Sequence, residues 1–252
     1  MEINNSEINK ISLENLGSTI EETFNIYKRT ALINGLFFMI MVVVLAILTI
    51  IGLNYFFNVN DLSEQLKGFK PENLTISQLL VFIGVSLAIN VLIIPFVAGM
   101  LKVNEEADLK QTANFSTIVS LVNSPVYIQS VLGIIVTTLI TSILNYGYIL
   151  LGLNSNLKIL FTILSSVFGL FSFFTIPLII FKNRNVFEAI ELSFKATSKN
   201  LVFVVITVFL GIIAACLGIF ALCIGIFFTA PIFYTVQYVL YKRIFEHEIL
   251  KA

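Results

Sequence analysis

A row of uncharged polar side chains follows one face of the apolar segment 126–153. Gln129, Thr137, Thr141 and Asn145 are spaced by eight, four and four residues, so they share one slowly drifting face of a helix. Amide and hydroxyl groups donate and accept hydrogen bonds without carrying charge. In apolar surroundings such a face can line a path for a solute or lipid headgroup, or it can hold two helices together. The sequence leaves both interpretations open.

A second candidate feature is the pair Asn90 and Pro95, inside the apolar segment 78–101. A proline removes one N–H from a helix and leaves a carbonyl one turn earlier without its donor. The Asn90 amide can satisfy that carbonyl, and broken helices of this kind form substrate sites in transporters. A kink satisfied locally is the commoner outcome. The candidate residues for a substrate path or a packing stripe are therefore Asn90, Pro95, Gln129, Thr137, Thr141 and Asn145.

Catalytic and metal-binding chemistry is not indicated. The interiors of the apolar segments contain no Asp, Glu, Lys, Arg or His, whereas ion-coupled transporters and intramembrane enzymes usually keep such a residue despite its cost. The chain also lacks HExxH, GxSxG, GxxxxGK[ST] and CxxC patterns. His247 between Glu246 and Glu248 gives too few converging ligands for a metal site. We predict a protein that is not an enzyme and has no cofactor.

The composition defines the class of protein that must position these residues. Hydrophobic residues make up 58% of the chain and charged residues 12%, against roughly 45–50% and about 25% in soluble domains. Mean hydropathy is +0.97. So much apolar surface requires the bilayer as solvent. The formal net charge is zero, so nothing suggests a nucleic-acid partner. The sequence predicts an all-α integral membrane protein.

Six transmembrane helices are expected in a single membrane domain, 1–252. About 20 helical residues cross a bilayer, and four apolar segments reach that length, at 31–57, 78–101, 126–153 and 157–181. The run 201–241 is about twice one span, so it must fold back as two spans, 201–217 and 219–241. We place its turn between Leu217 and Gly225.

Basic residues predict the orientation. Twelve of the 15 Lys and Arg residues lie on one side of the expected spans, and only Lys67, Lys70 and Lys158 lie on the other. Cytoplasmic loops attract Lys and Arg. Both termini are therefore expected in the cytoplasm, in a multi-pass protein of the inner (cell) membrane.

Amphipathic helices are expected between the spans, at the cytoplasmic interface. The first 30 residues contain one, with Leu13, Leu16, Ile20, Phe24 and Tyr27 at helical spacing. Another is expected to start at Asn185, with Glu188 three residues later. Three apolar segments contain a proline: Pro95, Pro177 and Pro231. Together these features suggest a threefold repeat of helix-hairpin units.

The stretch 174–245, under a third of the chain, resembles a widespread group of bacterial multi-pass membrane proteins whose roles are uncharacterised. The group includes the membrane domain attached to some glycerophosphoryl diester phosphodiesterases. The residues that carry the resemblance are Pro177, Ala189, Ser193, Asn200, Pro231 and Tyr241. The resemblance implies a similar membrane architecture and says little about activity, because the chain has no room for a phosphodiesterase barrel.

Two functions are consistent with the sequence. The first is a non-catalytic envelope or membrane-assembly component whose interfacial helices contact membrane lipids, a cytoplasmic protein partner or a second copy of the chain. The second is an uncoupled transporter or channel for a small neutral or amphiphilic substrate, whose path follows the polar face of segment 126–153 and the kink at Asn90 and Pro95.

Overall fold

The computed structural model of the chain describes residues 7–56, 75–112, 116–117, 124–220 and 225–246. Within these ranges the chain is helical and contains no strand. The longer helices are α1 (Leu16–Phe56), α3 (Ile76–Asp108), α5 (Pro125–Leu150), α6 (Lys158–Phe171) and α9 (Leu201–Cys216). The others are α7 (Thr175–Lys182), α8 (Val186–Lys199), α10 (Gly225–Thr229) and α11 (Ile232–Phe245). Short 3-10 turns lie at Leu13–Asn15, Ser155–Leu157 and Leu217–Phe220.

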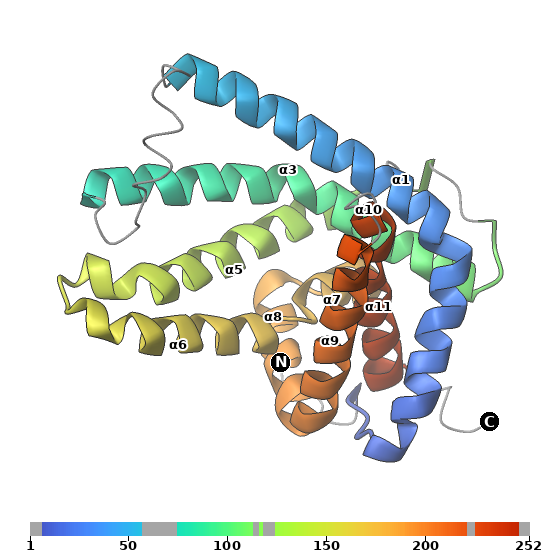
Figure 1. Cartoon of the computed structure of the whole chain (residues 1–252). Coiled ribbons are helices and arrows are strands. Elements are labelled where there is room, and N and C mark those ends of the chain that lie inside the picture. The colour runs from blue at the N-terminus through green and yellow to red at the C-terminus, as the bar shows by residue number, and fades with distance from the viewer. Residues whose placement is uncertain (1–6, 57–74, 113–115, 118–123, 221–224, 247–252) are drawn as a thin grey trace.

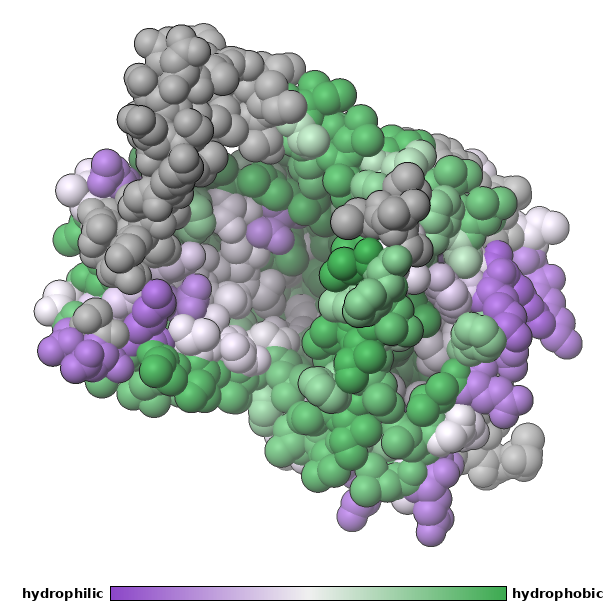
Figure 2. Space-filling model, in the orientation of Figure 1, coloured by the Kyte–Doolittle hydropathy of each residue, from purple (hydrophilic) through white to green (hydrophobic). Residues whose placement is uncertain are grey.

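Among the residues that the structure describes, five helical segments are long and apolar enough to cross a membrane: Leu13–Ile47, Ile76–Asp108, Pro125–Leu150, Lys158–Lys182 and Leu201–Phe220. Their outer faces are apolar, and large side chains such as Val81 and Ile159 are 66% and 73% exposed. In Figure 2, apolar surface runs along α6 and α9, and hydrophilic side chains gather near the start of α1 and the end of α3. A soluble protein rarely exposes contiguous apolar surface on this scale. The expected membrane class is confirmed.

The helices form two groups that meet at one end (Figure 1). α3, α5 and α6 fan out to the left of the view, and α9 with α10 and α11 forms a hairpin that packs against α1. α5 and α6 are antiparallel neighbours, as expected from the short loop between them. The Ser165 hydroxyl of α6 donates to the carbonyl of Thr141 in α5 at 3.2 Å. The fan leaves space between α3, α5 and the α6–α7 junction.

The expected N-terminal amphipathic segment and the expected first span join in one helix, α1, which is continuous from Leu16 to Phe56 and changes direction along its length (Figure 1). Its apolar side chains Leu13, Ile20 and Phe24 are largely exposed, where a helix at the membrane interface would meet lipid. The buried face is instead rich in threonine and comprises Thr19, Thr23, Ile26 and Thr30. Each of these threonine hydroxyls donates to a carbonyl of its own helix. Small, internally bonded side chains let α1 approach the bundle closely.

Helix boundaries follow local chemistry. α5 begins at Pro125, and the hydroxyl of its N-cap residue Ser124 makes no capping bond. α8 begins as predicted, since the Asn185 side chain accepts from the backbone N–H of Glu188 at 3.0 Å. The connection before α5, residues 113–123, lies largely outside the described residues.

The three prolines are not placed alike. Pro95 lies inside the continuous helix α3. Pro177 lies in the first turn of α7, just after the break at residues 172–174 that divides the expected span 157–181 into α6 and α7. Pro231 separates α10 from α11. A helix tolerates a proline more easily in its first turn, where the missing N–H would be unbonded anyway.

Side chains from the opposite end of the chain hold the N-terminal segment in place. The Asn200 carboxamide accepts from the backbone N–H of Ile11 at 2.8 Å and donates to the carbonyl of Asn9 at 2.9 Å. The Lys199 ammonium donates to the carbonyl of Ile8 at 2.6 Å. The backbone N–H of Asn9 donates to the carbonyl of Ile244 at 2.8 Å. The turn between α8 and α9 therefore anchors this segment.

We expect Asn200→Ala to release the N-terminal segment, because it leaves the buried N–H of Ile11 without an acceptor, at a cost of about 1–3 kcal/mol. Trypsin cleavage after the exposed Lys10 should then accelerate in purified protein. Ser198→Ala is the matched control, because the exposed Ser198 hydroxyl bonds only its own helix. Equal cleavage rates in both variants would contradict this anchoring role.

Candidate functional site

A cavity of about 470 Å³ lies between α3, α5, the α6–α7 break and α11. Figure 2 shows the molecule hollowed beside the fan of helices, with pale and hydrophilic side chains inside the hollow. The lining of the cavity combines uncharged polar groups with apolar and aromatic ones. It includes Phe82, Asn90, Thr137, Thr141, Ser142, Asn145, Ser172, Phe173, Thr175, Ile176 and Gln237.

Four of the six residues singled out in the sequence converge on this cavity: Asn90, Thr137, Thr141 and Asn145. Gln129 and Pro95 do not line it. Gln129 lies in the second turn of α5, and Pro95 lies in the second half of α3, nearer to the charged end of that helix at Asp108. Three of the four polar positions predicted in α5 line the cavity, and the polar face extends past it at Gln129.

Three of the predicted polar residues donate hydrogen bonds to carbonyls of their own helices. The Thr137 hydroxyl donates to the carbonyl of Gly133 at 2.8 Å, and the Thr141 hydroxyl donates to the carbonyl of Thr137 at 2.7 Å. The Asn90 amide donates to the carbonyl of Ser86 at 2.9 Å. Asn90 therefore does not use the carbonyl that Pro95 would leave free one turn earlier. Thr137 and Thr141 offer methyl groups and acceptor lone pairs to the cavity.

The break between α6 and α7 forms one wall of the cavity, and two side chains from other helices stabilise it. Ser193 of α8 donates to the carbonyl of Phe171 at 2.6 Å and accepts from the amide of Phe174 at 3.0 Å. Gln237 of α11 donates to the carbonyl of Phe173 at 2.6 Å. Backbone groups freed by a helix break in apolar surroundings need such partners. The break is thus a fixed part of the fold.

Two residues at this wall, Thr175 and Gln237, were not predicted as site residues. Thr175 is 1% exposed, and its hydroxyl has no hydrogen-bond partner. Gln237 is 8% exposed. The sequence did carry a signal for Gln237, because it is an isolated amide in an otherwise apolar run. The sequence also carried a signal for Thr175, because it ends a row of small and hydroxyl residues along the segment 157–181 that faces the polar side of segment 126–153 in the expected hairpin.

The cavity is electrically neutral, since none of its lining residues is Asp, Glu, Lys, Arg or His. A charged group of a ligand would lose its hydration in such a site and find no opposite charge to compensate for that loss of free energy. Within the described part of the chain, no three His, Cys, Asp or Glu residues gather as metal ligands. The arrangement can accept a molecule with uncharged hydrogen-bonding groups and apolar surface.

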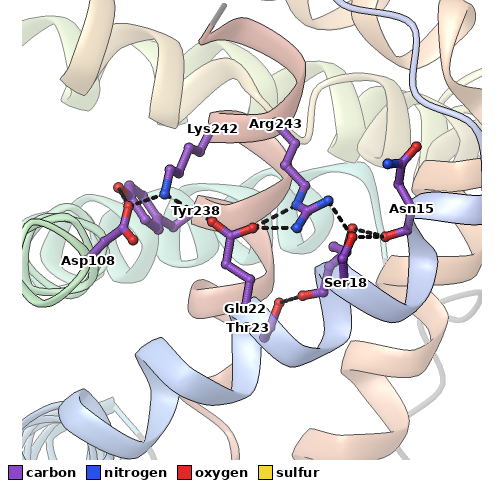
Figure 3. A network of polar contacts seen from close by, with 9 residues as sticks. Asn15, Ser18, Glu22, Thr23, Asp108, Tyr238, Lys242 and Arg243 are labelled. Carbon is purple, nitrogen blue, oxygen red and sulfur yellow. Dashed lines mark hydrogen bonds and ion pairs between the residues drawn. The ribbon is translucent and has the colours of Figure 1, made fainter. Parts of the chain in front are cut away.

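Charged residues form a separate network where α1, α3 and α11 meet (Figure 3). The Lys242 ammonium lies 2.5 Å from the Asp108 carboxylate and 2.9 Å from that of Glu22, and Arg243 lies 2.7 Å from Glu22. The Tyr238 hydroxyl donates to Asp108 at 3.0 Å. We call these five residues the charged clamp. It joins helices from the start, middle and end of the chain.

The surroundings of Lys242 in the charged clamp favour the charged form of its side chain. Burial alone would lower the pKa of the Lys242 ammonium, but hydrogen bonds to Asp108 and Glu22 and their negative charges outweigh burial and raise it. A folded pKa above the unfolded value, about 10.4 for lysine, adds stability that is fully present below that value. This stability is lost as pH rises through the folded pKa.

No family model, curated protein or solved structure matches this chain in comparisons with known proteins. The function must therefore be inferred from the geometry of the cavity and of the charged clamp.

We expect Lys242→Met to destabilise the protein by about 3 kcal/mol, because it leaves Asp108 and Glu22 without their shared cation in a largely buried position. Lys195→Met is the control, since Lys195 pairs with Glu191 one turn away in an exposed position, where such pairs contribute about 0.3–0.5 kcal/mol. Thermal unfolding in detergent should also show that wild type, but not Lys242→Met, loses this increment above about pH 10.4. Similar losses from both substitutions would contradict the clamp.

Proposed function

We propose that this chain is a non-catalytic, multi-pass bacterial cell-membrane protein that holds or passes a small uncharged amphiphile in the cavity between α3, α5, the α6–α7 break and α11. The observation that carries the proposal is the convergence of Asn90, Thr137, Thr141 and Asn145, from two helices, on one cavity. Helix packing alone would bring small polar residues into contact and close the space between them.

The size and chemistry of the cavity support a small-molecule ligand. Its volume of about 470 Å³ falls in the range of roughly 300–1,000 Å³ common for small-molecule sites. Its lining mixes apolar side chains with a few hydrogen-bonding groups, as such sites do. The absence of Asp, Glu, Lys, Arg and His from the lining favours an uncoupled role over proton- or ion-coupled transport.

Six spans with both termini in the cytoplasm form part of the proposal. Residues 225–241 supply the sixth, since α10 and α11 together make about 30 Å of helix and α11 packs beside α9. Figure 1 shows α9 running toward α10 and α11 returning. The charged clamp and the anchored N-terminal segment lie at the end where most basic residues gather, which the positive-inside rule assigns to the cytoplasm.

Reporter fusions test this topology. A green fluorescent protein fused after Ala252 should fluoresce, and alkaline phosphatase at the same point should be inactive, because the C-terminus is cytoplasmic. Alkaline phosphatase fused after a truncation at Leu153 should be active, since the loop before Lys158 faces outward. Active phosphatase at the C-terminus would contradict six spans with this orientation.

An envelope-assembly role is the second candidate, and a separate observation favours it. Phe187 in α8 is 76% exposed at the expected cytoplasmic interface. A large exposed aromatic side chain there suits contact with lipid headgroups or with a protein partner, including a second copy of the chain. The resemblance of 174–245 to bacterial multi-pass membrane proteins stays a prediction alongside it.

The direct test is native mass spectrometry of protein extracted with its own lipids. We expect a specific uncharged amphiphile on the wild type and its loss in Ser142→Phe, which fills the cavity from α5. Ser166→Phe, on the exposed face of α6, is the matched control and should keep the ligand. A stoichiometric protein partner together with an empty cavity in the wild type would instead support the assembly role.

A further inference from the structure

Two aromatic side chains mark one end of the cavity. Phe82, in the second turn of α3, and Tyr146, near the end of α5, pack edge to face with ring centroids 5.9 Å apart. Asn145 precedes Tyr146 at this level, whereas Asn90 follows Phe82 by eight residues of helix and lies about 12 Å farther inward. This end lies away from the charged clamp, so the proposed topology places it toward the outer side of the membrane. We call it the outer end of the cavity.

The Asn145 carboxamide is able to bond a molecule at the outer end. The residue is half-buried and lines the cavity, and its side chain makes no hydrogen bond within the described part of the chain. Neither of its amide atoms is among the buried unpartnered atoms, so both keep accessible surface. Thr138, Thr141 and Ser142, on the same face of α5, line the cavity as well, whereas Ile143 is 55% exposed on another face. The amide is therefore directed to the cavity.

Two neighbouring groups add to this capacity for hydrogen bonds. The Tyr146 hydroxyl also lines the cavity, keeps accessible surface and bonds none of the residues that the structure describes. Asn90 donates to the carbonyl of Ser86, and its own carbonyl oxygen accepts no bond from the described residues. A carboxamide both donates and accepts, as does a phenol. Uncharged donors and acceptors thus meet at the outer half of the cavity, and Figure 2 shows hydrophilic side chains inside the hollow.

The inner end of the cavity offers fewer unused donors. It lies at the α6–α7 break, which α6 reaches after 14 residues, about 21 Å of helix. Ser172 and Gln237 donate to backbone carbonyls there, and the Thr175 oxygen is almost completely inaccessible. Phe173 and Ile176 add apolar surface. A bound amphiphile therefore finds its unused hydrogen-bond partners mainly at the outer end and apolar contacts at the inner end.

The chemistry of the outer end favours a head with several hydroxyl groups. Each hydroxyl can donate one hydrogen bond and accept others, so a polyol can satisfy an amide and a phenol together. An ether or ester oxygen only accepts, and it would leave the carbonyl oxygen of Asn145 without a donor. A charged head is disfavoured, because no opposite charge lines the cavity. The rings of Phe82 and Tyr146 add apolar area beside these polar groups, and the C–H face of a sugar ring can pack there.

We infer that the outer end of the cavity binds the neutral polyol head of an amphiphile, as in an alkyl glycoside, and that the Asn145 amide distinguishes this head from a single alcohol. The tail extends inward along Phe173 and Ile176. This inference rests on the proposed function. It adds the chemical class of the head, the direction of the ligand in the cavity and the residue that selects the head.

The test compares radiolabelled octyl β-glucoside with 1-octanol, which has the same tail, on full-length protein in nanodiscs, with binding to empty nanodiscs subtracted. Wild type should prefer the glucoside, and Asn145→Leu should lower glucoside affinity about tenfold, as expected for one or two lost hydrogen bonds, and remove most of the preference. Gln129→Leu is the matched control, because it removes an amide of α5 that does not line the cavity. Glucose and octanoate should compete poorly, since one lacks an apolar tail and the other is anionic.

Thermal unfolding separates recognition from helix packing. Without a probe, Asn145→Leu should not lower the unfolding temperature, because the amide has no hydrogen bond to lose within the described chain. Asn145→Gln, which restores an amide, should recover the preference for the glucoside. A lower unfolding temperature in Asn145→Leu would assign the residue to packing and overturn the inference.

Equal affinity of wild type for the two probes would also overturn the inference, and so would an unchanged preference in Asn145→Leu. If Ser142→Phe still abolishes binding of both probes in that case, the proposed function survives without this selection of the head. If Ser142→Phe leaves binding unchanged, both proposals fail.

Discussion

The structure depends on one constraint: backbone polar groups in apolar surroundings must find partners inside the protein. Continuous helices meet it along most of the chain. Where α6 ends before α7, the helix cannot meet it, and Ser193 and Gln237 supply the missing donor and acceptor groups. These two side chains come from α8 and α11, so the break determines how three parts of the last third of the chain must pack.

The same constraint distinguishes two parts of the protein. At one end, the closed end, polar contacts join the helices, and on one side, the open side, helices diverge. At the closed end, charges that could not enter a bilayer singly are paired in the charged clamp, and Asn200 satisfies the backbone of the N-terminal segment. On the open side, α3 and α5 diverge and leave a neutral cavity. Rigid polar contacts at one end allow the helices to enclose space elsewhere without losing their mutual positions.

The sequence predicted features set by local chemistry and missed those set by tertiary contacts. The apolar length of the segments predicted the long helices, and residue preferences predicted the cap at Asn185. The break before Pro177 was missed, because apolar composition does not distinguish a broken span from a continuous one. The sequence also did not indicate that Thr19, Thr23 and Thr30 form the buried face of α1, because a threonine that bonds a nearby carbonyl can pack against other helices in apolar surroundings although hydrophobicity does not single it out.

An unpartnered buried atom is not by itself evidence of a binding site. Asn34 and Asn104 lie in the core between α1 and α3, and each has one unpartnered amide atom. They nevertheless bond each other at 3.2 Å, and neither lines the cavity. Their unpartnered atoms are a local cost of a polar contact that joins two helices. The Thr175 hydroxyl is a similar case, because it has no partner and its oxygen is almost completely inaccessible. Its unpartnered state is a local cost of the break between α6 and α7, where Ser193 and Gln237 satisfy the backbone groups instead.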